Sequence, residues 1–354
     1  KANIEIAKSL FKQTKYQDTI DTCNQILITD NNSIEAIKLI ARCFLAIRKI
    51  DDARLYLNQA LNINPDDFEV IKDLGNTYQA FGDINTAKKY YKKAIEINST
   101  YAPALTNLGS IELNKGNQQE ALSLLVKATE SDPQLAPAWG NLANGYVQLG
   151  KTQEAKIACR KSIELNPNLF NSHFLLGTIL LGQKKLQEAE KALRKTIELK
   201  PDLPDANYNL GVLLMDLGKL QEAEKVFHKT IQLQPTYANA HANLGNVLCN
   251  LGKLREAEFF TRKAILIQPN VANNHYNLGR ILIDLGRLKE AVFSYHKVVE
   301  IQPDFVSAHY NLGTILLDLG RLKEAELSLR KTIQLNPSLS IAHANLGKLF
   351  RDLG

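Results

Sequence analysis

Several residue types that mark common protein classes are scarce in this chain of 354 residues. It has one tryptophan, one methionine and four cysteines, and aromatic residues make up only 7%. The cysteines show no CxxC spacing, which argues against a disulfide scaffold and predicts reduced thiols in a cytoplasmic protein. The longest strongly apolar stretch, residues 174–182, is too short to span a bilayer, and no cleavable signal pattern opens the chain.

A strong excess of one charge is also lacking. The 43 basic and 37 acidic residues leave a net charge of +6, too balanced to indicate a nucleic-acid binder. No GxSxG, HExxH, P-loop or GxGxxG motif occurs. We therefore predict no catalytic residues, no cofactor, no metal and no nucleic-acid partner for this chain.

What the chain does have is a period of 34 residues. Sixteen of the 19 glycines occupy two columns with this period, and an alanine column and a proline column accompany them. The first glycine column forms Leu-Gly pairs, at Leu74-Gly75, Leu108-Gly109, Leu176-Gly177, Leu210-Gly211, Leu244-Gly245, Leu278-Gly279, Leu312-Gly313 and Leu346-Gly347.

Each column has a physical reason within one unit, residues 204–237. Apolar residues recur there at helical spacing, which predicts two helices of about 13 residues. Gly218 stands where the first helix should end, and Pro235 stands where the second should end. Gly211 and Ala223 are small, so the two helices can approach closely if these residues face each other.

Over essentially the whole chain, the units resemble tetratricopeptide repeats, as in AHANLGNVLCNLGKLREAEFFTRKAILIQP from Ala240. The resemblance implies an all-α superhelix whose first helices line a concave groove and whose second helices form the convex side. The predicted single array has units at 1–33, 34–67, 68–101, 102–135, 136–169, 170–203, 204–237, 238–271, 272–305 and 306–339, and a half unit at 340–354. Leu346, Phe350 and Leu353 of the half unit should be partly uncovered, and we expect a truncated longer protein.

Some positions depart from the pattern without being expected to break the array. Thr14, Arg48 and Lys184 replace turn glycines, and Ser99 replaces a proline. They mark places where the curvature of the array can change.

Two further columns have competing interpretations. A histidine column is a candidate metal site, but repeats about 10 Å apart cannot share one zinc ion, so packing between repeats is favoured. A lysine column of the second helices offers a basic stripe, but glutamates three residues later predict a solvated ridge of ion pairs. The histidines are His173, His241, His275, His309 and His343.

The most informative surface is a polar stripe on the first helices. Its central column stands one residue before the Leu-Gly or Leu-Ala pair and consists of Asn107, Asn141, Asn209, Asn243, Asn277, Asn311 and Asn345. Neighbouring positions on the same helix face add Asn239, Asn273 and Asn246, and then Asp216, Asp284, Asp318 and Asp352. Leu175 and Asp73 interrupt the column.

Asparagine is a poor helix former, by up to about 0.7 kcal/mol per site, so something must offset seven of them. One interpretation is structural: the amide braces a neighbouring helix or loop. The other is functional: donor and acceptor together match a peptide backbone. The column also resembles the array of protein O-GlcNAc transferase and SPINDLY-like proteins, which implies that these asparagines hold substrate backbone, although tetratricopeptide repeats in general favour asparagine there.

Three hypotheses for function follow. The first is a non-catalytic scaffold that binds an extended, basic or Ser/Thr-rich peptide or protein segment along the asparagine column. The second is the substrate-recruiting arm of a larger transferase, such as a glycosyltransferase. The third is a self-assembling scaffold that docks through its terminal half repeat.

Overall fold

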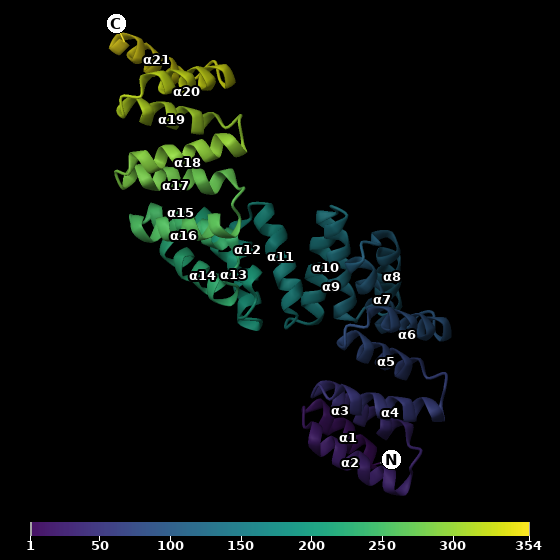
Figure 1. Ribbon diagram of the computed structural model, residues 1–354. Coiled ribbons are helices and arrows are strands. Elements are labelled where there is room, and N and C mark those ends of the chain that lie inside the picture. Colours follow the sequence, from purple (N-terminus) through teal and green to yellow (C-terminus); the bar gives the residue numbers. More distant parts are fainter. Residues whose placement is uncertain (1, 354) are drawn as a thin grey trace. The chain divides into compact units, whose positions relative to one another are not determined.

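The computed structural model describes residues 2–353, and helix is the only regular secondary structure in this range. Within residues 2–165 and within residues 204–335, successive helices pack against each other in pairs, which gives a series of helix-turn-helix hairpins (Figure 1). This confirms the predicted all-α repeat fold. The chain divides into two compact units, residues 1–179 and 180–354. No helix between residues 2 and 353 is long and apolar enough to cross a bilayer.

The hairpins consist of odd-numbered first helices and even-numbered second helices. The first helices are α1 (Ala2–Lys12), α3 (Ile34–Ala46), α5 (Phe68–Ala80), α7 (Ala102–Asn114), α9 (Ala136–Gln148), α11 (Phe170–Gly182), α13 (Pro204–Asp216), α15 (Ala238–Asn250), α17 (Ala272–Asp284), α19 (Val306–Asp318) and α21 (Ser340–Leu353). The second helices are α2 (Tyr16–Thr29), α4 (Ile50–Ile63), α6 (Ile84–Ile97), α8 (Gln118–Ser131), α10 (Thr152–Leu165), α12 (Leu186–Leu199), α14 (Leu220–Leu233), α16 (Leu254–Ile267), α18 (Leu288–Ile301) and α20 (Leu322–Leu335).

The turn inside each hairpin needs one residue in the left-handed backbone region. Seven glycines of the second column supply it, with φ between 71° at Gly150 and 83° at Gly116. Where the glycine is missing, Thr14, Arg48 and Lys184 adopt the same conformation, with φ of 60°, 60° and 57°. The repeat geometry is therefore kept at these three turns, against the preference of residues that carry a Cβ.

Replacing Arg48 with glycine should stabilise the first hairpins by about 1 kcal/mol, because glycine adopts positive φ without the Cβ penalty. The measurement is urea unfolding followed by circular dichroism. Gly82→Ala is the matched reverse change, since Gly82 has a φ of 81° and nothing lies within 4 Å of an added Cβ. An Arg48→Gly protein that unfolds at lower urea than the parent would contradict the strain argument.

The first glycine column lets a large side chain of the second helix sit against the first helix. A Cβ on Gly211 would lie 2.6 Å from the Phe227 ring, and one on Gly279 would lie 2.8 Å from the Tyr295 ring. The three atoms nearest to a Cβ on Gly211 belong to Phe227, which stands four residues after Ala223 in α14. In two other repeats the alanine column also lies against the glycine, since a Cβ on Gly109 would lie 3.4 Å from the Ala121 carbonyl oxygen and one on Gly245 would lie 3.3 Å from that of Ala257. Helix approach therefore uses both the small residues of the two columns and a large side chain that fills the glycine gap.

The last helix, α21, has a face that is only partly covered. Leu349 is buried and Leu346 is half-buried, whereas Phe350 is 43% exposed, as the sequence predicts. The Arg330 guanidinium lies 5.6 Å from the centre of the Phe350 ring. The side chains of Leu353 and Asp352 lie outside the described residues.

Candidate functional site: the first-helix face

We use the term first-helix face for the surface of the first helices that carries the asparagine column and the columns beside it. The seven asparagines are all half-buried, so each presents part of its amide to the surface. Each stands directly before a Leu-Gly or Leu-Ala pair, and in α7, α9, α13, α15, α17 and α19 both residues of this pair are buried against the neighbouring helices. The geometry therefore holds the amides in place on a packed scaffold.

Several of these amides brace adjacent repeats. Asn243 donates to the Tyr208 hydroxyl at 3.2 Å, and Asn311 donates to the Tyr276 hydroxyl at 3.3 Å. Asn345 donates to the Tyr310 hydroxyl at 3.5 Å. Each bond joins one first helix to the first helix before it. These bonds provide the structural offset that the poor helix propensity of asparagine requires.

The tyrosines that accept these bonds were missed in the sequence analysis. Tyr208, Tyr276 and Tyr310 share one repeat position, directly before an asparagine of the column, so the pattern itself was visible. Tyr208 stacks on Tyr237, with ring centres 4.9 Å apart, and Tyr276 stacks on Phe305 at 5.1 Å. Aromatic packing therefore fixes the hydroxyls that hold the asparagines.

A cavity of about 400 Å³ opens on the first-helix face of residues 1–179. Polar side chains from three consecutive first helices line it: Ser110 of α7, Asn141 and Asn144 of α9, and Asn171 of α11. Within residues 2–353, Asn141 and Asn144 make no hydrogen bond through their side chains, unlike the bracing asparagines above. The apolar part of the wall includes Phe174 and Leu175. Amide groups with unused donors and acceptors therefore surround a hollow large enough for a short stretch of ligand.

The other predicted site residues occupy the edges of the face. Asn239 and Asn273 are exposed near the start of α15 and α17, and Asn246 is half-buried in α15. Asp216, Asp284 and Asp318 are exposed at the ends of α13, α17 and α19. The Lys184 ammonium lies 2.9 Å from the Asp216 carboxylate, so the negative charge at Asp216 is partly offset.

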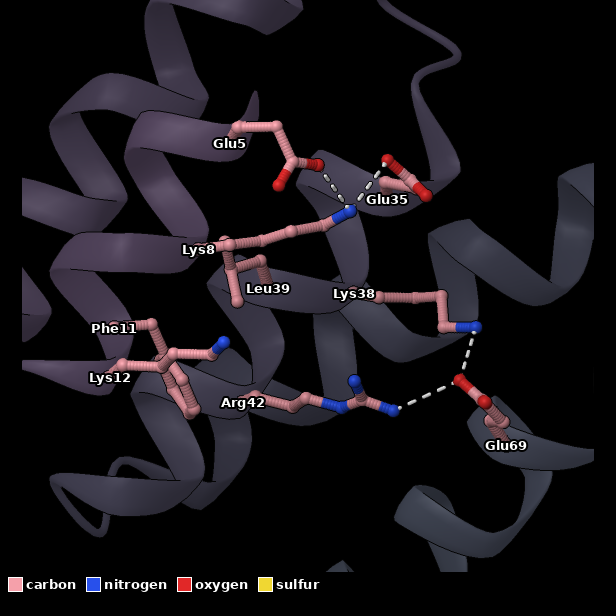
Figure 2. Close-up of a pocket in the computed structure, with 9 residues that line it drawn as sticks. All are labelled: Glu5, Lys8, Phe11, Lys12, Glu35, Lys38, Leu39, Arg42 and Glu69. Carbon is pink, nitrogen blue, oxygen red and sulfur yellow. Dashed lines mark hydrogen bonds and ion pairs between the residues drawn. The ribbon is translucent and has the colours of Figure 1, made fainter. Parts of the chain in front are cut away.

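In the first three repeats the same face carries charges instead of amides. A cavity of about 320 Å³ is lined by Lys8 of α1, Lys38 and Arg42 of α3, and Glu69 of α5 (Figure 2). Lys38 approaches Glu69 to 2.7 Å, and Arg42 approaches it to 3.1 Å. Burial acts to raise the pKa of the Glu69 carboxyl, but the bond from Lys38 and the charges of both cations hold that pKa below its usual value.

This charged segment was also missed in the sequence analysis. Its signal is that Glu35 and Glu69 share one repeat position, as do Lys38 and Lys72. Arg42 further binds Asp73, whose side chain is 4% exposed and which interrupts the asparagine column. Within residues 1–179 the first-helix face is therefore of two kinds, ion-paired over α1, α3 and α5 and amide-rich over α7 and α9. Within residues 180–354 the first helices again carry amides.

The histidine column has a structural role. The imidazole Nε2 of each histidine donates to the carbonyl of the proline six residues earlier, at 2.8 Å for His275 and 2.9 Å for His309. Trp139 at the same repeat position donates to the Pro133 carbonyl at 3.0 Å. Because proline ends the second helix, this bond ties the loop between repeats to the next first helix. Among residues 2–353, no group of three or more His, Cys, Asp or Glu residues is placed to hold a metal ion.

The lysine column shows the predicted ion pairs at three positions. Lys161, Lys195 and Lys297 lie 3.1, 2.6 and 2.6 Å from the glutamates three residues later. These pairs are exposed, so they contribute little stability.

The family models that match the chain all describe helical repeats. The model described as the cilia and flagella-associated protein 70 C-terminal domain matches residues 66–275, more than half of the chain. Tetratricopeptide repeat models match residues 10–74, 279–320 and 306–339. The chain belongs to the tetratricopeptide repeat family. Its architecture is therefore one that suits protein–protein interaction, and the amide-rich part of the first-helix face is the candidate surface of this tetratricopeptide repeat array.

Several solved structures resemble the chain in part. PilF of Pseudomonas aeruginosa is 18% identical and has a TM-score of 0.52, with 61% of this chain and 97% of that one covered. YrrB, described as a tetratricopeptide repeat protein with an unusual peptide-binding site, is 27% identical, with a TM-score of 0.46 and coverage of 52% and 95%. A Cut9–Hcn1 structure is 13% identical, with a TM-score of 0.49 and coverage of 97% and 95%. No curated protein matched the chain.

Proposed function

We propose that this chain is a non-catalytic interaction scaffold that holds an extended peptide or protein segment along the amide-rich part of the first-helix face. The observation that carries the proposal is the cavity of about 400 Å³ between α7, α9 and α11. Asn141 and Asn144 line it, and neither amide has a hydrogen-bond partner in residues 2–353. A half-buried amide without a partner is costly unless a ligand or water completes its bonds.

The spacing of the repeats supports an extended ligand. Packed helices lie about 8–10 Å apart, so equivalent amides of successive repeats recur on the order of 10 Å. An extended chain advances about 3.3 Å per residue, so three ligand residues cover about 10 Å, one repeat. Each amide then meets the backbone of every third ligand residue, and a backbone contact imposes no sequence requirement.

On the first-helix face of residues 180–354, taken by itself, charge favours a basic or hydroxyl-rich ligand segment. The carboxylates of Asp284 and Asp318 are exposed at the edge of the first-helix face, and neither forms an ion pair in the described range. A lysine or arginine of the ligand would supply the missing partner, and serine or threonine hydroxyls would donate to the same oxygens.

The test is the double variant Asn141→Ala and Asn144→Ala, assayed by fluorescence anisotropy against labelled Ser/Thr-rich and Lys-rich peptides. Loss of two hydrogen bonds of about 1 kcal/mol each should weaken binding about 30-fold. Thermal stability should stay equal or rise, because neither amide bonds to another described residue and alanine is the better helix former.

Two controls separate binding from bracing. Asn58→Ala changes an exposed asparagine of the second helix α4 and should leave binding unchanged. Tyr276→Phe removes the hydroxyl that Asn311 reaches and should lower stability by about 1 kcal/mol while binding persists. Unchanged peptide binding by the Asn141/Asn144 double variant would refute the proposed site. If an Asp/Glu-rich peptide bound as tightly as the Lys-rich peptide, the predicted preference for a basic ligand would be wrong.

A further inference from the structure

A row of exposed apolar side chains crosses three consecutive second helices. Phe259 of α16, Phe293 of α18 and Leu327 of α20 occupy the same repeat position and are 55%, 66% and 69% exposed. At this position the preceding repeats carry Lys191 and Lys225. Single exposed apolar residues need no explanation, but an exposed apolar side chain at the same position of three successive repeats indicates an interaction surface.

Cations flank this apolar row on both sides. Positions four residues before and after an exposed helical residue share its face. The preceding positions hold Arg255, Lys289 and Lys323, and the following positions hold Lys263, Lys297 and Lys331. The Lys263 ammonium lies 5.5 Å from the centre of the Phe259 ring. Both sides of the row are therefore positively charged.

The charges on these helices are unevenly paired. In the part of the chain that the structure describes, Arg255, Lys289 and Lys323 form no ion pair. Most of the acidic residues are neutralised. Within residues 2–353 Glu256 forms no ion pair, whereas five glutamates pair with cations of the same or a neighbouring repeat: Glu258, Glu290, Glu300, Glu324 and Glu326. The surface consequently offers free positive charge beside exposed apolar area.

A cavity of about 340 Å³ adjoins the row between α16 and α18. Leu278 and Leu282 of α17 are almost completely buried and contribute to its wall, as do Phe293 and Leu266, which is 74% exposed. Arg262, His275, Glu290 and Ser294 supply the polar part of the lining, and the Arg262 guanidinium lies 3.2 Å from the Glu290 carboxylate. This composition suits an apolar side chain inserted from a ligand.

We propose that the surface of α16, α18 and α20 docks an acidic amphipathic helix of a partner protein, with one of its apolar side chains in this cavity. Residues seven apart on a helix share one face and lie about 10.5 Å apart, so a helix laid across the second helices offers one apolar side chain after another to successive repeats. Apolar residues once per heptad would then meet Phe259, Phe293 and Leu327 in turn, and flanking glutamates would pair with the free cations. This surface lies on the second helices and is independent of the first-helix face.

Charge and shape favour an acidic helix over two other occupants of this surface, a second copy of the chain and an anionic membrane. A second copy of the chain would bring its own rows of cations against these, which is repulsive. An anionic membrane satisfies the charge but supplies no protruding side chain for the cavity.

The test uses the whole chain and a synthetic helix of about three heptads, with leucine once per heptad and glutamate on both flanks. We expect binding that weakens at least about 10-fold in the triple variant Phe259→Ala, Phe293→Ala and Leu327→Ala. Lys289→Glu with Lys323→Glu should weaken it by a similar factor, and added salt should weaken it further. The matched controls are Leu55→Ala and Ile157→Ala, which are 67% and 65% exposed on α4 and α10, and should bind like the parent.

Because all these side chains are exposed, circular dichroism should show every variant folded, and the charge variant tests the surface without removing apolar area. The proposal is overturned by unchanged affinity in the triple variant, or by equal binding of the same peptide with lysine in place of glutamate. It is also overturned if the peptide does not bind while phosphatidylserine vesicles do. Dimerisation in light scattering that the triple variant abolishes would assign the surface to a second copy and overturn it too.

Discussion

Replacing Lys88 with alanine is expected to destabilise the helices α6, α7 and α8 by about 3 kcal/mol. The Lys88 ammonium pairs with the carboxylate of Glu112, whose side chain is fully buried in α7. Asn117 donates to the other carboxylate oxygen at 2.6 Å. Without Lys88 the carboxylate is left buried with one bond, and an uncompensated buried charge is strongly destabilising.

Protonation limits the size of this effect and sets its pH dependence. In the variant, Glu112 can take up a proton instead of remaining charged and unpaired. The ordinary pKa of a glutamate is 4.5, which is 2.5 pH units below pH 7, and each unit corresponds to 1.36 kcal/mol. Protonation at pH 7 therefore costs about 3.4 kcal/mol, and the loss of stability cannot exceed this value. In the parent, burial raises the pKa of Glu112, but the bonds from Asn117 and Lys88 outweigh burial and hold the pKa below 4.5. The parent therefore loses this stability as the pH falls below 4.5, whereas the variant regains stability relative to the parent as the pH falls from 7 towards 5.

Amide hydrogen exchange in α6–α8 is the suitable measurement, because it reports the stability of these three helices separately from that of the other repeats. Glu112→Leu is the matched variant: the same repeat position holds Leu214, Leu248, Leu282 and Leu316, all buried. It should leave stability equal or raise it, since an apolar residue can replace a buried ion pair without loss. Faster exchange in Glu112→Leu than in Lys88→Ala would contradict this account.

Replacing Gly211 with alanine should destabilise the α13–α14 hairpin by about 2 kcal/mol. Inside a helix this change normally stabilises by about 1 kcal/mol. Here the new Cβ would lie 2.6, 2.8 and 2.9 Å from three atoms of the buried Phe227 ring. Overpacking of this kind costs about 1–3 kcal/mol and reverses the sign of the substitution.

The chain contains its own control for this prediction. Gly347 occupies the same repeat position in α21, and nothing lies within 4 Å of its added Cβ, so Gly347→Ala should be neutral or stabilising by up to about 1 kcal/mol. The double variant Gly211→Ala with Phe227→Leu should recover part of the loss, because leucine is smaller than the ring. Chemical denaturation of the four proteins tests the set, and a Gly211→Ala protein as stable as the parent would show that the ring moves aside freely.

The period of 34 residues was enough to predict the helices, their lengths and the turn positions. It predicted the ends at Gly218 and Pro235 because those residues act through their own backbone. It did not predict which side chain fills the glycine gap, since Ala223 and Phe227 stand one turn apart on the same helix face and only packing decides between them. Nor did it predict the positive φ at Arg48, because tertiary contacts impose it against local preference.

The asparagine column was predictable as a surface, but its chemistry was not. From sequence, Asn141 and Asn311 are equivalent members of one column. In the structure Asn311 is committed to Tyr276 and Tyr295, whereas Asn141 lines a cavity without a bond to another described side chain. The difference lies in the neighbouring repeat, where a tyrosine precedes Asn277 and a threonine precedes Asn107.

By itself the sequence determined the repeat, the helix boundaries and the fold class, because these follow from spacing and from the backbone preferences of glycine and proline. The tertiary structure decided which equivalent positions differ in role: which asparagines brace, where a glutamate is buried with a lysine, and where apolar side chains on second helices stay uncovered. These depend on pairs of residues brought together from different repeats. A periodic sequence describes each repeat alike, and only packing against its neighbours makes one repeat physically different from the next.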